Sequence, residues 1–186
     1  MSGVLSDNLG RSSGLIKAVA APASGFTQGT EVASTSGTTV AFSSIPAGID
    51  MIVVGFNGVS TNGTSGFRLR IGDAGGIETS GYESGIGRIY IDGANTTNGG
   101  RHTAGFGILQ TLTAAGDTVH GQIILTLEDS SNFTWVAQGQ LWDSGALDYI
   151  NNSCGSKTLS AELTQLDVTT VSGDTFDAGA INIMYQ

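Results

Sequence analysis

The sequence predicts an all-β protein, an antiparallel β-sandwich of jelly-roll-like form that is preceded by an extended N-terminal arm. Three observations predict this fold. From Thr38 onward, apolar side chains recur with a period of two, which is the spacing of a half-buried strand. Clusters of Asn, Asp, Gly and Pro, which favour tight turns, separate these segments. No long segment has the periodicity of a helical layer, which excludes a βαβ architecture and its nucleotide crevice.

Individual strands follow from this alternation. Val40 and Phe42 are separated by small residues, and a Pro/Gly turn at 46–48 precedes a run of β-branched and aromatic residues at 51–60. The segment FRLRI, which begins at Phe67, alternates apolar residues with arginines, so one face is apolar and the other basic. The strands predicted in this way are 38–45, 51–60, 67–71, 87–91, 103–109, 118–128, 133–142, 158–171 and 178–185, with turns at Asn62, Asn98, 115–117, 129–132 and 172–174.

The predicted strand 133–142 contains both tryptophans. Trp135 and Trp142 are separated by an odd number of positions, so their side chains point to opposite faces of the strand. Because large rings favour burial, we expect this strand to lie centrally in its sheet, or to have its second face covered by a loop or another subunit.

The chain divides by composition into a docking arm at 1–37 and a β-sandwich domain at 38–186. Small residues dominate the arm, and Gly10 and Gly14 each cost about 1 kcal/mol in a helix interior, so we do not expect a stable free helix. We expect a partner to order the arm through apolar and positively charged side chains; the alternative is a disordered leader. The residues expected to dock are Leu5, Leu9, Arg11, Leu15, Ile16, Lys17 and Val19.

Charge and cysteine content exclude several classes of function. The formal net charge of −9 opposes a phosphate backbone, so nucleic acid is not an expected partner. One Cys and two His cannot build a Cys/His zinc site or an intrachain disulfide, and no cofactor is expected. No signal peptide is evident, and no apolar run approaches the roughly 18 residues that membrane insertion needs.

The sequence also lacks a recognisable catalytic motif, so we do not expect an enzyme. His102 and His120 lie in or beside predicted strands, and no Gly-x-Ser-x-Gly or His-Glu-x-x-His pattern accompanies either one. Cys154 is expected to be a packed or partly exposed residue rather than a nucleophile. Most carboxylates lie in predicted turns, where Asp is favoured for its local hydrogen bonds. A calcium site is a minor alternative, formed by Asp73, Glu78 and Glu83.

Three stretches carry a resemblance. IPAGIDMIVVGFNGVSTNGTSGFRLRIGDAGGIETSGY at 45–82 and DTFDAGAINIMYQ at 174–186 resemble a β-rich module of structural proteins of tailed bacteriophages, particularly marine ones. In that family the module is often attached to tail fibres or other virion proteins. The opening LSDNLGRSSGLIKA is similar to the short piece that precedes such modules. The resemblance implies a non-enzymatic protein located in the virion, with other virion proteins as partners, and it supplies no binding residues.

The function expected from these observations is a head-decoration protein or a short fibre-like appendage. The chain has no long coiled coil or repeated shaft, which favours a compact decoration or adaptor protein over a long fibre. Strand edges need protection, so we expect self-association. The number of subunits, a homotrimer, is implied by the resemblance alone.

The alternative function is a glycan-binding adhesin for attachment to the host surface. Exposed aromatic rings stack on sugars, and the candidates for glycan contact are Trp142, Tyr82 and Tyr149; Tyr90 is a further candidate. Packing in the core or in an interface is the competing interpretation for each ring. A polysaccharide-degrading enzyme is the third and weakest hypothesis, since spacing alone identifies no pair of catalytic carboxylates.

Overall fold

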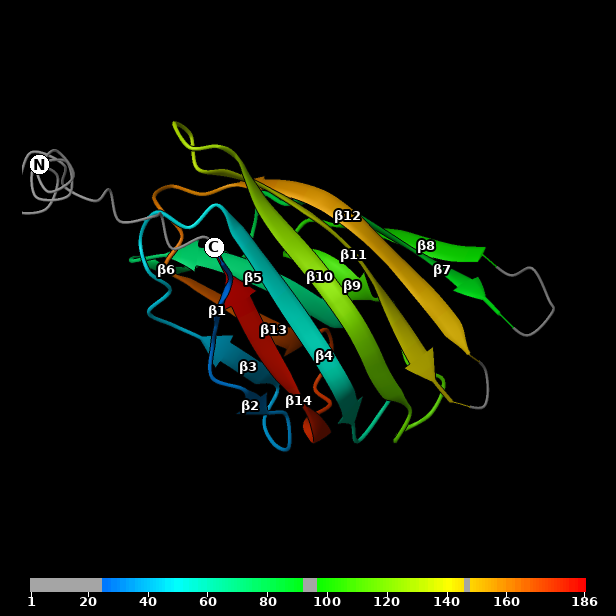
Figure 1. Cartoon of the computed structure of the whole chain (residues 1–186). Coiled ribbons are helices and arrows are strands. Elements are labelled where there is room, and N and C mark those ends of the chain that lie inside the picture. Colours follow the sequence, from blue (N-terminus) through cyan, green and yellow to red (C-terminus); the bar gives the residue numbers. More distant parts are fainter. Residues whose placement is uncertain (1–24, 92–96, 146–147) are drawn as a thin grey trace, which may run out of the picture.

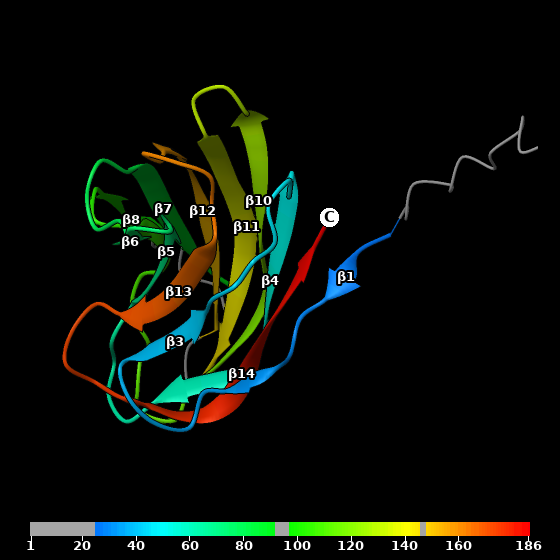
Figure 2. The ribbon, with the colours of Figure 1, turned by 90° about the vertical axis from the view of Figure 1, so that its left-hand side faces the viewer.

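The computed structural model describes residues 25–91, 97–145 and 148–186, and every regular element in these ranges is a β-strand. The strands form two antiparallel sheets packed face to face, which Figure 2 shows edge-on. The predicted all-β sandwich is therefore confirmed. The residues predicted to dock a partner, Leu5 to Val19, lie outside the described ranges.

The larger sheet has nine strands, and Figure 1 looks onto its outer face. Hydrogen-bonded neighbours follow the order β1-β14-β4-β10-β11-β12-β7-β8, and β2 also pairs with β14. The predicted central position of the tryptophan-bearing strand, β11, is confirmed. The strands are β1 (Thr27–Gln28), β2 (Val32–Ala33), β4 (Met51–Thr61), β7 (Glu83–Tyr90), β8 (Thr97–His102), β10 (Thr118–Asp129), β11 (Thr134–Ser144), β12 (Tyr149–Thr158) and β14 (Phe176–Tyr185).

The smaller sheet has five strands in the order β3-β13-β5-β6, with β9 paired to β5. The chain passes from one sheet to the other between β2 and β3, β3 and β4, β4 and β5, β6 and β7, β8 and β9, β9 and β10, β12 and β13, and β13 and β14. Repeated crossing between two antiparallel layers is the connectivity of a jelly roll. The strands are β3 (Thr39–Phe42), β5 (Phe67–Asp73), β6 (Gly76–Ile77), β9 (Phe106–Leu109) and β13 (Gln165–Thr170).

The hydrophobic core lies between the two sheets. Phe67 and Leu69 of β5 are fully buried, as are Ile123 and Leu125 of β10. The rings of Phe67 and Phe176 lie 5.3 Å apart and join the smaller sheet to the larger one. Each such side chain contributes about 1.5–3 kcal/mol through burial. Because the inner faces supply the core, the outer face of the larger sheet can carry other side chains.

The folded unit begins earlier than the sequence predicts. Residues 25–37 were expected to belong to the arm, yet β1 and β2 pair with β14. Ser34 is fully buried, and its hydroxyl donates a hydrogen bond of 2.8 Å to the carbonyl of Ala178. Small side chains add to the sheet edge here through backbone hydrogen bonds rather than through apolar burial. The predicted boundary at Thr38 is therefore wrong, and the sandwich begins by Thr27.

Strand β12 is the longest of the strands that the sequence did not predict, which also include β1, β2, β6 and β8. Its inward side chains are largely polar, so the apolar alternation that identifies a half-buried strand is missing. Asn151 accepts a hydrogen bond of 3.2 Å from the amide of Gln110, and Ser153 donates one of 2.6 Å to the carbonyl of Gly107. These bonds to β9 and its neighbour satisfy buried polar groups, which makes a polar inner face tolerable.

Three further boundaries differ from prediction. The strand predicted at 158–171 is not continuous. Its first residue, Thr158, is the last residue of β12, and β13 covers only Gln165–Thr170. The predicted strand 103–109 is reduced to β9, Phe106–Leu109. The predicted turn at Asn98 is wrong, since Asn98 and Gly99 lie within β8 opposite Arg88 and Gly87. At Asn98 and Gly99, strand pairing, which is not visible in local sequence, outweighs local turn propensity.

Candidate binding face of the large sheet

The outer face of β10, β11 and β12 is rich in uncharged polar side chains. Gln122, Gln140 and Asn152 are adjacent across the three strands, because Gln122 pairs with Gln140 and Gln140 pairs with Asn152. The Nε2 group of Gln140 donates a hydrogen bond of 2.8 Å to Oδ1 of Asn152. This bond orients two neighbouring amides on the surface.

The next row across the same strands is Ile124, Gln138 and Cys154. The two rows line a shallow hollow of about 560 Å³, within the roughly 300–1,000 Å³ typical of small-ligand sites. The backbone at Gly121 and Gly139 also lines it. A row of amides, one apolar side chain and one thiol therefore surround a single open depression.

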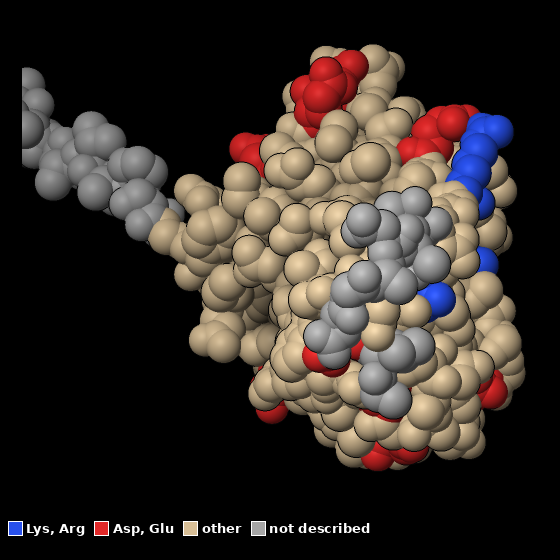
Figure 3. Space-filling view, turned by 90° about the vertical axis from the view of Figure 1, so that its right-hand side faces the viewer, with Lys and Arg blue, Asp and Glu red and all other residues tan. Residues whose placement is uncertain are grey.

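Glycines extend the open surface onto β7. Gly87 lies opposite Asn152 and Gly85 lies opposite Cys154, so neither position places a side chain beside the hollow. A Cβ added at either glycine would meet no heavy atom within 4 Å. The side of the molecule that carries β7 and β8 shows small, separate groups of charged atoms on a mostly uncharged surface (Figure 3).

An aromatic and aliphatic row flanks the amides. Trp142 pairs with His120 on one side and with Ile150 on the other, and Ile150 pairs with Ile89. The Trp142 side chain is 42% exposed, while Trp135 on the inner face of β11 is buried. The opposite orientation of the two tryptophans is thus as predicted, and in the described chain the face that carries Trp142 is open.

The imidazole of His120 supports the indole of Trp142. The two ring centroids are 5.7 Å apart with planes inclined by 31°. Nδ1 of His120 accepts a hydrogen bond of 3.3 Å from the amide of Gly58, which fixes the imidazole against β4. Trp142 therefore presents a supported ring on the same face as Gln140, two residues along the strand.

Tyr82, one of the three predicted glycan contacts, is placed elsewhere. Its side chain is only 1% exposed, and its ring packs edge-on against Phe106 at 5.0 Å. Its hydroxyl accepts a hydrogen bond of 2.9 Å from the amide of Ile71 and lies within hydrogen-bond distance of two carbonyls. Burial raises the pKa of Tyr82. The prediction that Tyr82 contacts glycan is therefore wrong, since Tyr82 is a core residue.

Tyr149, the other predicted tyrosine, is also buried. It lies at the start of β12 on the inner face and is 7% exposed. The guanidinium of Arg88 lies 4.1 Å from the centre of its ring, and the ring of Tyr90 is 5.2 Å away. Its ring is thus enclosed by its own chain, and this predicted glycan contact is also wrong.

A second polar cluster lies inside the sandwich near Tyr149. Asp143 of β11 is fully buried and accepts a hydrogen bond of 3.0 Å from Asn151. Burial raises the pKa of Asp143 to about 6, while the bond from Asn151 and the charge of Arg88 act in the opposite direction. Asp143 is closed to solvent, so it cannot act on a solute outside the sandwich.

The carboxylates considered for calcium are occupied by other groups. Asp73 accepts hydrogen bonds from the Ser160 hydroxyl and the Gly75 amide, and these bonds lower its pKa. Glu78 pairs with Lys157, and Glu83 pairs with Arg101 at 2.9 Å. Within the described ranges, no group of three or more His, Cys, Asp or Glu side chains is placed to hold a metal ion.

His102 and Cys154 do not form a catalytic pair. Burial and the charge of Arg68 lower the pKa of His102, which lies at the end of β8. Cys154 is exposed on β12. No helix in the described part of the chain is long and apolar enough to cross a membrane.

The structure therefore brings one predicted glycan contact, Trp142, together with four amides that were not predicted as site residues. Gln138 and Gln140 could have been found, because the alternation in 133–142 places them on the face of Trp142. Gln122 and Asn152 depend on strand pairing, which the sequence does not show. The surface offers hydrogen-bond donors, acceptors and one aromatic ring held in place by His120, a combination suited to binding a polar ligand. Neither a protein-family model, nor a curated protein, nor a solved structure matches the chain.

Proposed function

We propose that this chain is a non-enzymatic structural protein of a bacteriophage virion, a head-decoration protein or a short fibre-like appendage. It attaches through its N-terminal segment to other virion proteins and displays the β-sandwich. The observation that supports this proposal best is that two regions of the sandwich differ in character. Apolar side chains are exposed where the N-terminal segment joins the sandwich, and uncharged polar side chains cover the outer face of β10, β11 and β12.

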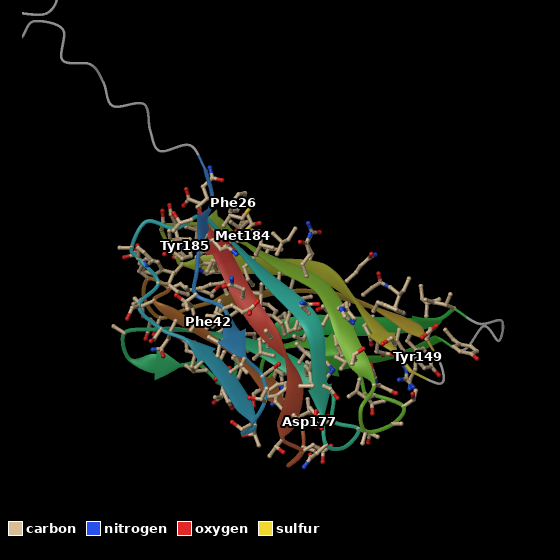
Figure 4. The ribbon with its side chains drawn as sticks, turned by 60° about the horizontal axis from the view of Figure 1, so that its bottom comes forward. Phe26, Phe42, Tyr149, Asp177, Met184 and Tyr185 are labelled. Atoms are coloured by element: carbon tan, nitrogen blue, oxygen red, sulfur yellow. The ribbon has the colours of Figure 1, made fainter. Side chains whose placement is uncertain are left out.

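The attachment end is marked by Phe26 and Met184. Both side chains are exposed, 46% and 37% respectively, although apolar residues of this size favour burial. They lie together with Tyr185 at one end of the molecule, and Tyr149 lies at the far end (Figure 4). Residues 1–24 join the sandwich at this end, so a partner that binds the N-terminal segment can also cover Phe26 and Met184.

Quantitative mass spectrometry of purified phage particles tests this function. Detection at the copy number of the repeated head positions assigns the protein to head decoration, and detection at the low copy number of tail components assigns it to an appendage. Absence of the protein from purified particles, while it is present in the infected cell, would refute both assignments.

A glycan-binding adhesin is the second candidate, and the exposure of Trp142 beside Gln140 is the observation that favours it. The purified chain is expected to give a signal on a glycan array, and Trp142→Ala is expected to weaken that signal. Because Trp142 lies on the open face, the variant should keep the unfolding temperature of the parent, which separates lost binding from lost folding. A signal of unchanged strength in the variant would count against Trp142 as a contact.

A further inference from the structure

We infer that the hollow on the outer face of β10, β11 and β12, together with the adjoining glycines of β7, binds an uncharged glycan chain. This inference deepens the adhesin candidate and rests on it, and it adds the site and the chemical class of the ligand. The residues assigned to the site are Gln122, Gln138, Gln140, Trp142 and Asn152, with Gly85 and Gly87 leaving room beside them.

The amides supply the hydrogen bonding that a sugar ring requires. Each side-chain amide offers two N–H donors and one acceptor oxygen, and adjacent hydroxyls of a pyranose can both donate and accept. The bond between Gln140 and Asn152 holds one such pair of amides in place before a ligand arrives. Gln122 and Gln138 also line the hollow, so their amides border the space that a ligand would occupy.

Charge selects the class of glycan. The outward positions of β11 and β12, from Thr134 to Trp142 and from Ile150 to Thr158, contain no Asp, Glu, Lys or Arg. On β10 the first charged side chain, Glu128, lies at the far end of the strand. The residues that line the hollow include no cation, and Arg101, which lies on β8 opposite Gly85, is paired with Glu83. An anionic glycan would therefore find no unpaired cation beside the hollow and would meet the net charge of −9 of the chain. A neutral glycan meets neither obstacle.

The shape of the surface suits an extended chain rather than a single small molecule. The hollow spans three neighbouring strands, and the glycines of β7 continue the surface without side chains beyond Asn152 and Cys154. Trp142 flanks the amide row, where its exposed indole can pack against the apolar C–H face of a sugar. The contact to His120 fixes the orientation of the ring, which reduces the entropy lost on binding.

The unique cysteine provides a direct test with the full-length chain. Cys154 is exposed and lines the hollow, so a bound glycan should shield its thiol from iodoacetamide. The probes are neutral gluco-, galacto- and manno-oligosaccharides, with alginate and polysialic acid as anionic counterparts. We expect at least one neutral class to slow the alkylation of Cys154 in a saturable manner, and the anionic glycans to leave its rate unchanged.

Three variants and one control locate the site. Gln140→Ala is expected to weaken binding roughly three- to tenfold, the effect of losing one or two hydrogen bonds. Trp142→Ala should weaken it further. Gly87→Phe places a ring into open space beside Asn152 and should block binding without strain. Gln28→Ala removes an exposed amide on β1, outside the hollow, and should bind like the parent. Unfolding temperatures verify that each variant is folded.

Each outcome has a distinct meaning. Protection by a neutral glycan that is lost in Gly87→Phe supports the inference. A glycan-array signal that all three variants retain would overturn this site while leaving the adhesin candidate intact, and the absence of any signal would overturn both. Protection by the anionic glycans alone would overturn the assigned ligand class.

A separate outcome concerns self-association. If Gly87→Phe changes the mass of the purified protein in light scattering, the face is an interface between copies and the inference is wrong. Virion membership is tested separately by mass spectrometry.

Discussion

Buried charge is the feature at the scale of single residues that most affects stability. Asp143 is enclosed between β11 and β12, and only one of its oxygens has a hydrogen-bond partner among the described residues. A carboxylate that loses its hydration without full compensation favours its protonated form. Burial therefore raises the pKa of Asp143 to about 6 from the ordinary value of 3.8 for an aspartate.

The pH dependence of stability should show this effect. A carboxyl group whose pKa is raised by folding binds more protons in the folded state between the two pKa values, so the free energy of unfolding falls as pH rises through that window. Here the window is about pH 4 to 6, and the total loss is up to about 3 kcal/mol. Chemical denaturation of the parent and of Asp143→Asn across this range measures the difference. The variant should lack this component of the slope, and parallel curves would contradict the raised pKa.

Two arginine pairs differ sharply in burial and make a matched comparison. Arg70 donates two hydrogen bonds, of 2.8 and 2.6 Å, to Asp167, and the side chains are 20% and 5% exposed. Arg101 pairs with Glu83, but these side chains are 68% and 70% exposed. Arg70→Met leaves a buried carboxylate without its partner, which typically costs about 3–5 kcal/mol. Arg101→Met should cost less than about 1 kcal/mol. Urea unfolding that gives equal losses would refute the difference.

At the scale of elements, the sequence predicts the strands that bury apolar residues at every second position. β4, β5, β10 and β11 were predicted for this reason, and their inward residues form the core. β12 was not predicted, because Asn151, Ser153 and Lys157 face inward and are satisfied by partners distant in the chain. Local alternation thus identifies strands that bury apolar side chains but not strands that bury hydrogen-bonded polar ones.

The candidate site shows the same division. Trp142 was predicted because a large ring on an outward position is visible in the sequence, whereas Tyr82 and Tyr149 were assigned wrongly because an isolated tyrosine gives no sign of burial. The neighbourhood of Gln140 and Asn152 arises from the pairing of β11 with β12. Strand pairing across a sheet depends on tertiary contacts, so no reading of one segment could have supplied it.

A close approach between β4 and β14 gives a prediction for single glycines. Both strands are irregular where Gly58 and Gly179 meet, and Gly179 has φ of +85°. A Cβ on Gly179 would lie 2.3 Å from the carbonyl of Gly58. Gly179→Ala should therefore destabilise the sandwich by at least about 1–3 kcal/mol, whereas Gly85→Ala, in open space, should change stability by less than about 0.5 kcal/mol. Thermal unfolding of both variants checks this, and similar midpoints would contradict the close approach.

At the scale of the whole molecule, open sheet edges and exposed apolar side chains favour self-association. β8 ends the larger sheet, and the side chains of Ile89 and Ile91 are exposed beside it. An unprotected edge strand can pair with another chain, and a closed symmetric oligomer covers such edges. The resemblance to phage modules implies a homotrimer, so we expect multi-angle light scattering to return three times the chain mass of 18.9 kDa. The mass of a single chain at micromolar concentration would contradict self-association in solution.

We propose that the N-terminal segment attaches the protein to the particle and that the sandwich folds without it. Residues 1–20 precede the first described strand, β1, and the buried core residues of the described fold run from Val40 to Ile183. Leu5, Leu9 and Leu15 can supply apolar anchors, and Arg11 and Lys17 can meet an acidic partner surface. Deletion of residues 1–20 should therefore leave the unfolding temperature unchanged, which serves as the control for folding.

The incorporation of this truncated chain into phage particles measures whether residues 1–20 attach the protein. Particles assembled with only the truncated protein present should lack it after purification, while particles assembled with the full chain contain it at the normal copy number. Both chains carry Phe26, and only the full chain carries the side chains from Leu5 to Val19, so retention of the full chain sets the reference. Incorporation of the folded, truncated chain at the normal level would show that the sandwich itself attaches to the particle, and would contradict the assigned role of the N-terminal segment.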